Sequence, residues 1–234
     1  MTRQIVLDTE TTGLSPQQGH RIIEVGCVEL LGRQLTGNNL HLYINPEREI
    51  DAGAIKVHGL TAAFLSNKPK FSTIIKKLMT YLQGAELIIH NAPFDLGFLN
   101  HELQLAGSQY QKIEEQCTVL DTLTLARHKH PGQRNSLDAL CQRYEVDNSN
   151  RDLHGALLDS ELLATVYLRM TGGQTQLFAA EEENTGHQAR HAIKRVTEDR
   201  PPLEIIKPSA DELQAHQAYL KMLNKNDDCL WPEE

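Results

Sequence analysis

Two acidic side chains stand two residues apart near the N-terminus. Asp8 and Glu10 follow an apolar run at positions 5–7, which is typical of a buried strand. Because side chains alternate along a strand, residues 8 and 10 would lie on the same face. Two carboxylates this close repel each other, and a divalent cation with oxygen ligands between them would relieve the repulsion. Acids at a strand end are also common as solvated surface residues, so this pair alone leaves both interpretations open.

Three more side chains fit the same chemistry. Asp95 follows the apolar segment 86–90 and falls in the first turn of an expected helix, where the helix dipole favours an acid in any case. Asp159 interrupts the apolar face of another expected helix, where an unpaired carboxylate would be costly. His154 begins that helix, and the dipole there favours a neutral imidazole that can accept a proton. Ligands of open α/β sheets bind beyond the strand ends, so these groups can meet the first two acids.

The segments that carry these residues alternate between strand and helix patterns. Strand patterns occupy residues 4–8, 21–31, 40–45 and 86–90, of which the first three read as consecutive antiparallel strands. Helical patterns occupy residues 71–82, 92–105 and 153–170, with Asn91 and Asp152 as expected N-caps. Segments 117–126 and 136–144 supply further strand or helix pieces. This alternation predicts an α/β domain with a partly parallel sheet over residues 1–173.

Composition narrows the class of protein. Of the 234 residues 40% are hydrophobic, which is enough for a core, and no run of 18 apolar residues predicts a membrane span. The four cysteines are scattered without a CxxC pair, and no signal-peptide pattern opens the chain, so we expect reduced thiols and a cytoplasmic protein. The net charge of −8 argues against broad electrostatic binding of nucleic acid but allows an enzyme that grips phosphates through metal ions.

The four acids and the histidine also match a known sequence pattern. Asp8-x-Glu10, Asn91-x-x-x-Asp95 and His154-x-x-x-x-Asp159 resemble, in this order, the DEDD superfamily of 3′→5′ exonucleases in its histidine-bearing branch. The segments LDTETTGL, RIIEVGCVEL, VHGLT, HNAPFD, RNSLDALC and RDLHGALLDSELLATVY are similar to the proofreading family of bacterial replicative DNA polymerase III. The resemblance covers nearly the whole chain. It implies a ribonuclease H-like fold, a mixed central sheet flanked by helices.

The resemblance further implies a mechanism and a set of site residues. Asp8, Glu10, Asp95 and Asp159 would hold two Mg²⁺ or Mn²⁺ ions, whose four positive charges offset the four carboxylates. His154 would act as general base toward the attacking water. The substrate would be a DNA 3′ end, single-stranded or frayed, released as 5′-mononucleotides. Substrate contacts are expected from the acids Asp8, Glu10 and Asp159 and from Thr11, Thr12, His58, Asn91 and Phe94. For His58 a turn histidine without such a role is equally compatible.

The composition changes after the Gly-Gly pair at 172–173. Residues 174–200 are mostly polar and predict a flexible linker. In residues 201–234 the pattern Ser209-x-x-Glu212 predicts a capping box and a helix of about 15 residues. Because an isolated helix of that length is marginal in water, we expect it to fold against a partner, or else back onto the nuclease domain.

Partners of the C-terminal region follow from resemblance alone. The peptide 174–178, QTQLF, resembles sliding-clamp-binding peptides, with Gln174, Leu177 and Phe178 as contacts to the beta clamp. Residues 201–234 would bind the alpha subunit of the polymerase. The expected apolar anchors are Leu213, Tyr219, Leu220, Leu223 and Trp231. A small theta-type subunit is a further partner that the resemblance allows, and no membrane contact is expected.

Two alternatives remain open at this point. An exoribonuclease of the same branch would carry the same acids and histidine, although such enzymes generally lack a tethered C-terminal helix. A replisome scaffold with a vestigial nuclease site is the second alternative. The presence of all five chemical residues argues against it.

Overall fold

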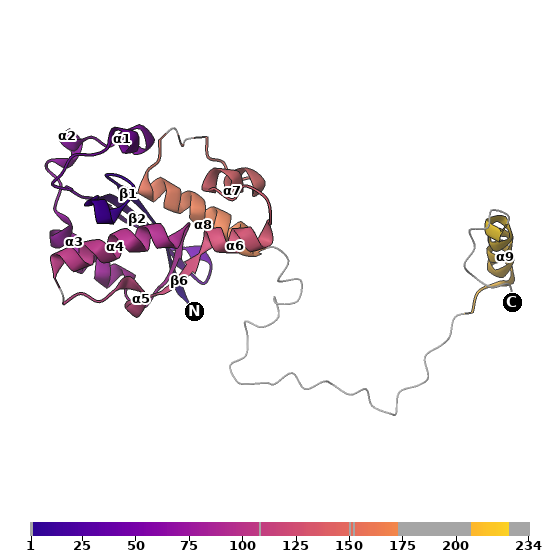
Figure 1. Cartoon of the computed structure of the whole chain (residues 1–234). Coiled ribbons are helices and arrows are strands. Elements are labelled where there is room, and N and C mark those ends of the chain that lie inside the picture. The colour runs from indigo at the N-terminus through magenta and orange to yellow at the C-terminus, as the bar shows by residue number, and fades with distance from the viewer. Residues whose placement is uncertain (1, 108, 150, 152, 173–206, 225–234) are drawn as a thin grey trace, which may run out of the picture. The chain divides into compact units, whose positions relative to one another are not determined.

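The structure is a computed structural model that describes residues 2–107, 109–149, 151, 153–172 and 207–224 (Figure 1). Contacts divide the chain into one unit within residues 1–180 and another within 181–234. The first unit contains every residue proposed above for the chemistry. The predicted linker 174–200, with Gln174, Leu177 and Phe178, lies outside the described residues, as does Trp231. The domain boundaries therefore stay predictions.

A six-stranded mixed sheet forms the centre of the first unit, in the order β3-β2-β1-β5-β6, with β4 paired to β2. Its strands are β1 (Arg3–Thr11), β2 (Ile22–Leu31), β3 (Gln34–Leu35), β4 (Leu40–Tyr43), β5 (Glu86–Ile89) and β6 (Thr118–Asp121). β2 runs antiparallel to β1 and β4, whereas β5 is parallel to β1 and β6. The predicted antiparallel start and partly parallel sheet are confirmed.

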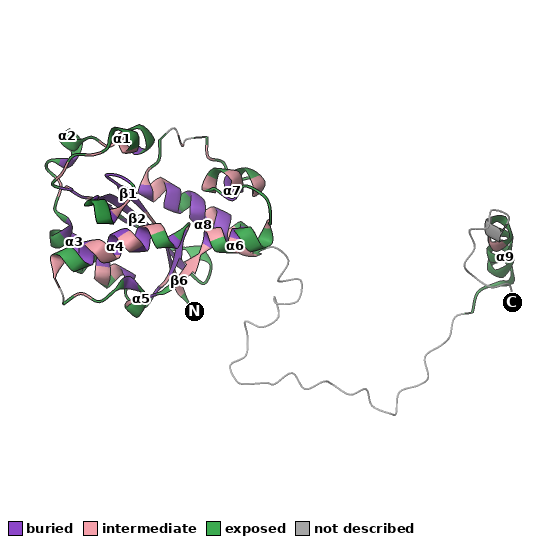
Figure 2. Ribbon diagram, viewed as in Figure 1, coloured by how far each residue is buried: buried purple, intermediate pink, exposed green. Residues whose placement is uncertain are grey.

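Helices cover both faces of this sheet. They are α1 (Ala52–His58), α2 (Ala62–Leu65), α3 (Phe71–Leu82), α4 (Ala92–Ala106), α5 (Ile113–Gln116), α6 (Thr122–Lys129), α7 (Leu137–Arg143) and α8 (Ala156–Gly172), with a 3₁₀ turn at Pro16–Gln18. Ile5 and Leu7 of β1 pack in one core cluster with residues of α3 and α4, whereas Val6 packs with α8 in another. Even-numbered residues of β1 therefore face α8. Figure 2 shows how much of β1, β2 and α8 is buried.

A glycine lets the start of α8 approach the sheet closely. Gly26 of β2 pairs with Asp8 of β1. A Cβ atom at residue 26 would lie 2.2 Å from the backbone of Ala156 and Leu157. The Ser160 hydroxyl also donates to the Gly26 carbonyl at 3.0 Å. The first turn of α8 is thus held directly on the strand beside the first acid.

Two local predictions need correction. The helix expected over 153–170 begins at Ala156, and His154 precedes it, its backbone N–H bound to the Val57 carbonyl at 3.0 Å. Asn91 does not cap α4 with its side chain; it adopts the left-handed region at φ 66°. Asp152, the other expected cap, lies outside the described residues. The helices expected over 71–82 and 92–105 are confirmed to within one residue at their ends.

The second unit has one described helix, α9 (Ala210–Asn224). Its capping box is confirmed: the Ser209 backbone N–H donates to Glu212 Oε2 at 2.7 Å, and the Glu212 N–H donates to Ser209 Oγ at 3.3 Å. Leu213 and Tyr219 are 47% and 58% exposed on this helix, and Leu220 is partly exposed. Within the described residues, none of the helices has the length and hydropathy needed to span a membrane.

Candidate active site

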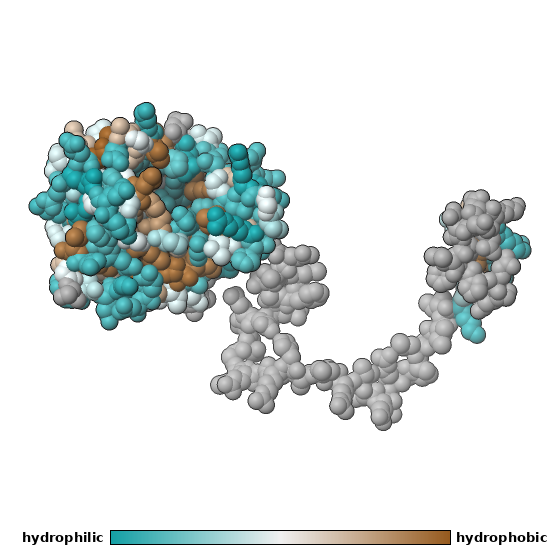
Figure 3. Space-filling view, in the orientation of Figure 1, coloured by the Kyte–Doolittle hydropathy of each residue, from teal (hydrophilic) through white to brown (hydrophobic). Residues whose placement is uncertain are grey.

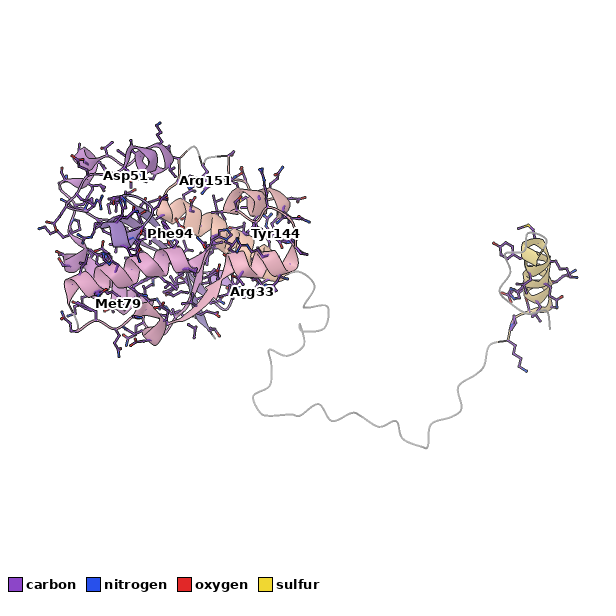
Figure 4. All side chains as sticks on the ribbon, in the orientation of Figure 1. Arg33, Asp51, Met79, Phe94, Tyr144 and Arg151 are labelled. Carbon is purple, nitrogen blue, oxygen red and sulfur yellow. The ribbon has the colours of Figure 1, made fainter. Side chains whose placement is uncertain are left out.

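The predicted chemical residues meet at one cavity of about 580 Å³ in the first unit. Asp8 and Glu10 come from the end of β1, Asp95 from the first turn of α4, and Asp159 from the first turn of α8. His154 comes from the loop ahead of α8. In Figure 4 the labels of Arg151, in this loop, and Phe94, on α4, mark two of the elements around this cavity. Four acids from three distant segments of the sequence thus line one cavity, as the sequence predicts.

Burial and crowding raise the pKa values of Asp8, Glu10 and Asp95. Burial, with the neighbouring carboxylates of Asp95 and Glu10, raises the pKa of Asp8 well above its ordinary value. The pKa of Glu10 is raised to about 8, first by burial and then by nearby acids. That of Asp95 is raised to about 7 by burial, although a hydrogen bond from Thr9 acts in the opposite direction. A cluster that resists ionisation in this way is one that a cation would stabilise.

Hydrogen bonds fix the orientation of the buried acids. Asp95 is 2% exposed and accepts a hydrogen bond from the Thr9 hydroxyl at 2.7 Å. Thr9 is odd-numbered and so points toward α4, which links that helix to the strand of the other acids. Asp159 is 3% exposed. Its Oδ2 lies 3.4 Å from Nδ1 of His154.

The donor set fits a divalent metal ion. Ligand atoms of Glu10, His154 and Asp159 all lie within 4.8 Å of one another. Carboxylate oxygens are the ligands that Mg²⁺ and Mn²⁺ favour. Together with the raised pKa values of the acids, this geometry supports a cation site at the end of β1.

Arg151 belongs to this site, and the sequence analysis did not find it. Its side chain is 6% exposed. Nε donates to Asp159 Oδ1 at 2.5 Å and Nη2 to Oδ2 at 2.6 Å. Nη2 also lies 2.9 Å from His154 Nδ1, and Nη1 donates to Asp138 Oδ1 at 2.5 Å. The available signal was its place within the motif that contains His154.

The helices α6 and α7 and the segment between them form another wall of the cavity. Its lining side chains are Arg127, Gln133, Asn135, Ser136 and Asp138. Part of this wall belongs to the motif RNSLDALC, for which the sequence alone predicts no role. The lining thus combines acids on one side with basic and amide groups on another, as a site for a phosphodiester requires. Figure 3 shows the surface of this unit as largely hydrophilic, with apolar side chains gathered toward the middle of the face shown.

The structure separates the expected substrate contacts into two groups. Asn91 and Phe94 line the cavity. His58 is 5% exposed; its Nδ1 accepts the Leu60 N–H at 3.0 Å, and its Nε2 has no hydrogen-bond partner among the described residues. Nε2 must then carry the proton of the neutral ring. Burial lowers the pKa of His58, which favours this neutral ring.

The hydroxyl groups of Thr11 and Thr12 form hydrogen bonds within the protein. The Thr11 hydroxyl donates to the Gly13 carbonyl at 2.7 Å. Thr12 is fully buried: its hydroxyl accepts the Arg21 N–H at 3.0 Å and pairs with His20, and its backbone N–H binds the Arg21 carbonyl at 2.9 Å. These bonds hold the loop that follows β1. A direct contact of either residue with substrate stays a prediction.

The comparisons agree with this geometry. A family model described as Exonuclease matches residues 5–167. Over 98% of its length the chain is 52% identical to DNA polymerase III subunit epsilon of Pasteurella multocida, of which it covers 93%. The chain belongs to the DNA polymerase III epsilon subunit family. The Escherichia coli epsilon subunit is 48% identical over 99% of this chain and 98% of its own length. As a member of the epsilon family, the chain is a proofreading 3′→5′ exonuclease, and its family is typically dependent on divalent metal.

Solved structures show the same fold at low sequence identity. Exonuclease X in complex with 5′-overhanging duplex DNA has a TM-score of 0.57 at 23% identity and covers 73% of this chain and 92% of its own. Exonuclease I of Escherichia coli with single-stranded DNA has a TM-score of 0.63 at 16% identity, over 74% and 41% of the two chains. The first unit of this chain therefore has a ribonuclease H-like exonuclease fold, as the sequence predicts.

Proposed function

We propose that this epsilon-family exonuclease removes mispaired 3′-terminal nucleotides of DNA at the described cavity and releases them as 5′-mononucleotides. The observation that carries the proposal is the convergence of four acids from three separate elements with His154 on one cavity. Proofreading requires a site that accepts one frayed strand end. A cavity of about 580 Å³ has the size of a site for one small ligand.

Two Mg²⁺ or Mn²⁺ ions would be held by Asp8, Glu10, Asp95 and Asp159. When bound, such ions stabilise the negative charge that develops on the phosphate and on the leaving oxygen. The protein contributes a fixed arrangement of carboxylates. Thr9 orients Asp95, and the contact of α8 with Gly26 sets the position of Asp159.

His154 would take the proton of the attacking water. A proton on its Nδ1 can be directed at Asp159 Oδ2, 3.4 Å away, which leaves the lone pair of Nε2 free to accept. The ring is partly exposed, so water reaches it. Asp159 would then both bind cation and orient the base.

The terminal nucleotide would be positioned by groups around this centre. His58 Nε2 offers a hydrogen bond, Asn91 an amide and Phe94 an apolar face. We further expect Thr11 and Thr12 to support this contact through the loop that they hold. Substitution of His58 by Leu should raise the KM for a single strand at least about threefold, the effect of one lost hydrogen bond, without changing Mn²⁺ binding.

Assembly with the polymerase follows from the relatives, which are named as subunits of DNA polymerase III. We propose that residues 201–234 bind the alpha subunit through Leu213, Leu220, Leu223 and Trp231, and that Gln174, Leu177 and Phe178 bind the beta clamp. The exposure of Leu213 on α9 supports a partner for that helix. A theta-type subunit is a further candidate partner, and action at a bacterial replication fork implies a cytoplasmic location.

The test is digestion of 5′-labelled strands by the full chain. We expect EDTA-sensitive release of mononucleotides from DNA, faster at a mismatched 3′ terminus than at a paired one, and none with Asp8→Asn. Preference for RNA would favour the exoribonuclease alternative. Absence of metal-dependent release would favour the scaffold with a vestigial site.

A further inference from the structure

The guanidinium of Arg151 donates hydrogen bonds to both carboxylate oxygens of Asp159 and contacts one ring nitrogen of His154. The two contacts to Asp159 are 2.5 and 2.6 Å, and Nη2 lies 2.9 Å from His154 Nδ1. Asp159 and His154 are two of the three residues, with Glu10, whose possible ligand atoms all lie within 4.8 Å of one another. The arginine thus occupies the carboxylate of Asp159, a proposed cation ligand, and at the same time contacts the proposed base.

The contact to His154 also fixes where its proton lies. A guanidinium only donates hydrogen bonds, so Nδ1 must accept from Arg151 and a neutral ring carries its proton on Nε2. A protonated Nε2 cannot take a proton from water. The tautomer needed for catalysis has the proton on Nδ1, directed at Asp159, and is therefore incompatible with the arginine contact.

We propose that Arg151 is a positioning residue that competes with the divalent cation for Asp159 and, through the same guanidinium, holds His154 in the tautomer that cannot act as base. The arginine holds the two side chains in place while the cation site is empty. When the site is filled, the guanidinium withdraws from them and remains bound to Asp138, whose side chain is 60% exposed at the cavity wall. Withdrawal allows His154 to adopt the catalytic tautomer. The inference rests on the proposed roles of Asp159 as ligand and His154 as base.

The chain offers a matched control for a merely structural arginine. Arg21 donates to Glu102 from Nε and Nη2, both at 2.7 Å, and the Glu102 side chain is 1% exposed. This pair has the same forked geometry as the Arg151–Asp159 pair, but neither residue lines the cavity. Loss of either arginine leaves a buried carboxylate without its cationic partner, which destabilises the fold.

The experiment compares Arg151→Gln, Arg151→Lys and Arg21→Gln in the full chain. In EDTA both Gln variants should lose about 5 °C or more of Tm. Saturating Mn²⁺ should restore most of the loss in Arg151→Gln, because the metal supplies the missing cation, but none in Arg21→Gln. Electron paramagnetic resonance should show a Mn²⁺ Kd about tenfold lower in Arg151→Gln, since a competing like charge is removed. Arg151→Lys, which keeps the charge without the fork, should lie between this variant and the parent.

The tautomer of His154 gives the decisive readout. At pH 8, where an ordinary imidazole is neutral, ¹⁵N NMR of the parent should show the His154 proton on Nε2 in EDTA and on Nδ1 in Mg²⁺. In Arg151→Gln the proton should be on Nδ1 under both conditions, whereas Arg21→Gln should behave as the parent. Unchanged or weaker Mn²⁺ binding in Arg151→Gln, or a parent tautomer insensitive to Mg²⁺, would overturn the inference. Undiminished cleavage by Asp159→Asn would instead count against the proposed function.

Discussion

Substitution of Gly26 by Ala should disable the site without touching any of its chemical groups. The new Cβ would lie 2.2 Å from the Ala156 carbonyl carbon and the Leu157 amide nitrogen. Non-bonded heavy atoms prefer separations of about 3.5–4.0 Å. Both neighbours are backbone atoms, so the first turn of α8, which carries Asp159, has to move away from β2 by about 1 Å or more.

A displacement of that size is large on the scale of catalysis. Misplacement of a reacting group by about 1 Å can cost about 100-fold in rate, and overpacking a core contact costs about 1–3 kcal/mol. Since domains are typically stable by about 5–15 kcal/mol, Gly26→Ala should remain folded at 25 °C with a lowered Tm. The assay is the initial rate of mononucleotide release at saturating Mn²⁺, measured beside a thermal melt.

Gly97 provides the matched control. It lies in α4, the helix that carries Asp95, and a Cβ there has no neighbour within 4 Å. Gly97→Ala should keep the parent's rate and gain up to about 1 kcal/mol, because Ala is the better helix former. A folded Gly26→Ala protein that cleaves within threefold of the parent rate would refute the role assigned to this contact.

The remaining predictions concern the acids, the pH dependence of stability, and residues 174–234. Asp8→Ala, Asp95→Ala and Asp159→Ala should each abolish cleavage while circular dichroism stays native; substantial activity at saturating Mg²⁺ would remove that residue from the site. In EDTA the free energy of unfolding should fall as pH rises from about 4.5 to about 8, because folded Glu10, with its pKa raised to about 8, holds a proton that the unfolded chain has released. Urea melts should show this fall in the parent and a shallower one in Glu10→Gln. A parent whose free energy of unfolding does not change over this pH range would contradict the raised pKa. A fragment of residues 1–173 should remain a folded nuclease but lose binding to the polymerase, checked by surface plasmon resonance. Retained binding would disprove the role proposed for residues 174–234.

Positions set by local periodicity were predictable. Strand alternation alone puts Asp8 and Glu10 on one face, and helical spacing gives α3 its bounds. The four acids stand at element ends, and neighbouring ends of strands and helices meet at the same edge of an α/β sheet. Their convergence could therefore be inferred before any coordinates.

Features that depend on tertiary contacts could not be inferred in this way. Arg151 becomes part of the site because the loop ahead of α8 places its side chain against Asp159. A single arginine in the sequence does not indicate that it will be buried in this way. The same loop is held by the bond from His154 to Val57, which delays the start of α8. At Asn91 the left-handed backbone replaced the expected cap, because its N–H binds Asp121 Oδ1, 30 residues away.

The alternation along β1 has a consequence for how this family can vary. Residues 5 and 7 of β1 belong to the α3–α4 layer and residue 6 to the α8 layer, on the side of the even-numbered acids. Deleting or inserting one residue before position 8 would turn the acids toward the opposite layer and move core residues into the cavity, since a slip of one residue reverses every side chain of a strand. We therefore expect lineages of this protein to accept many substitutions in β1 but changes of length only outside it, as in the exposed segment 32–39 after β2.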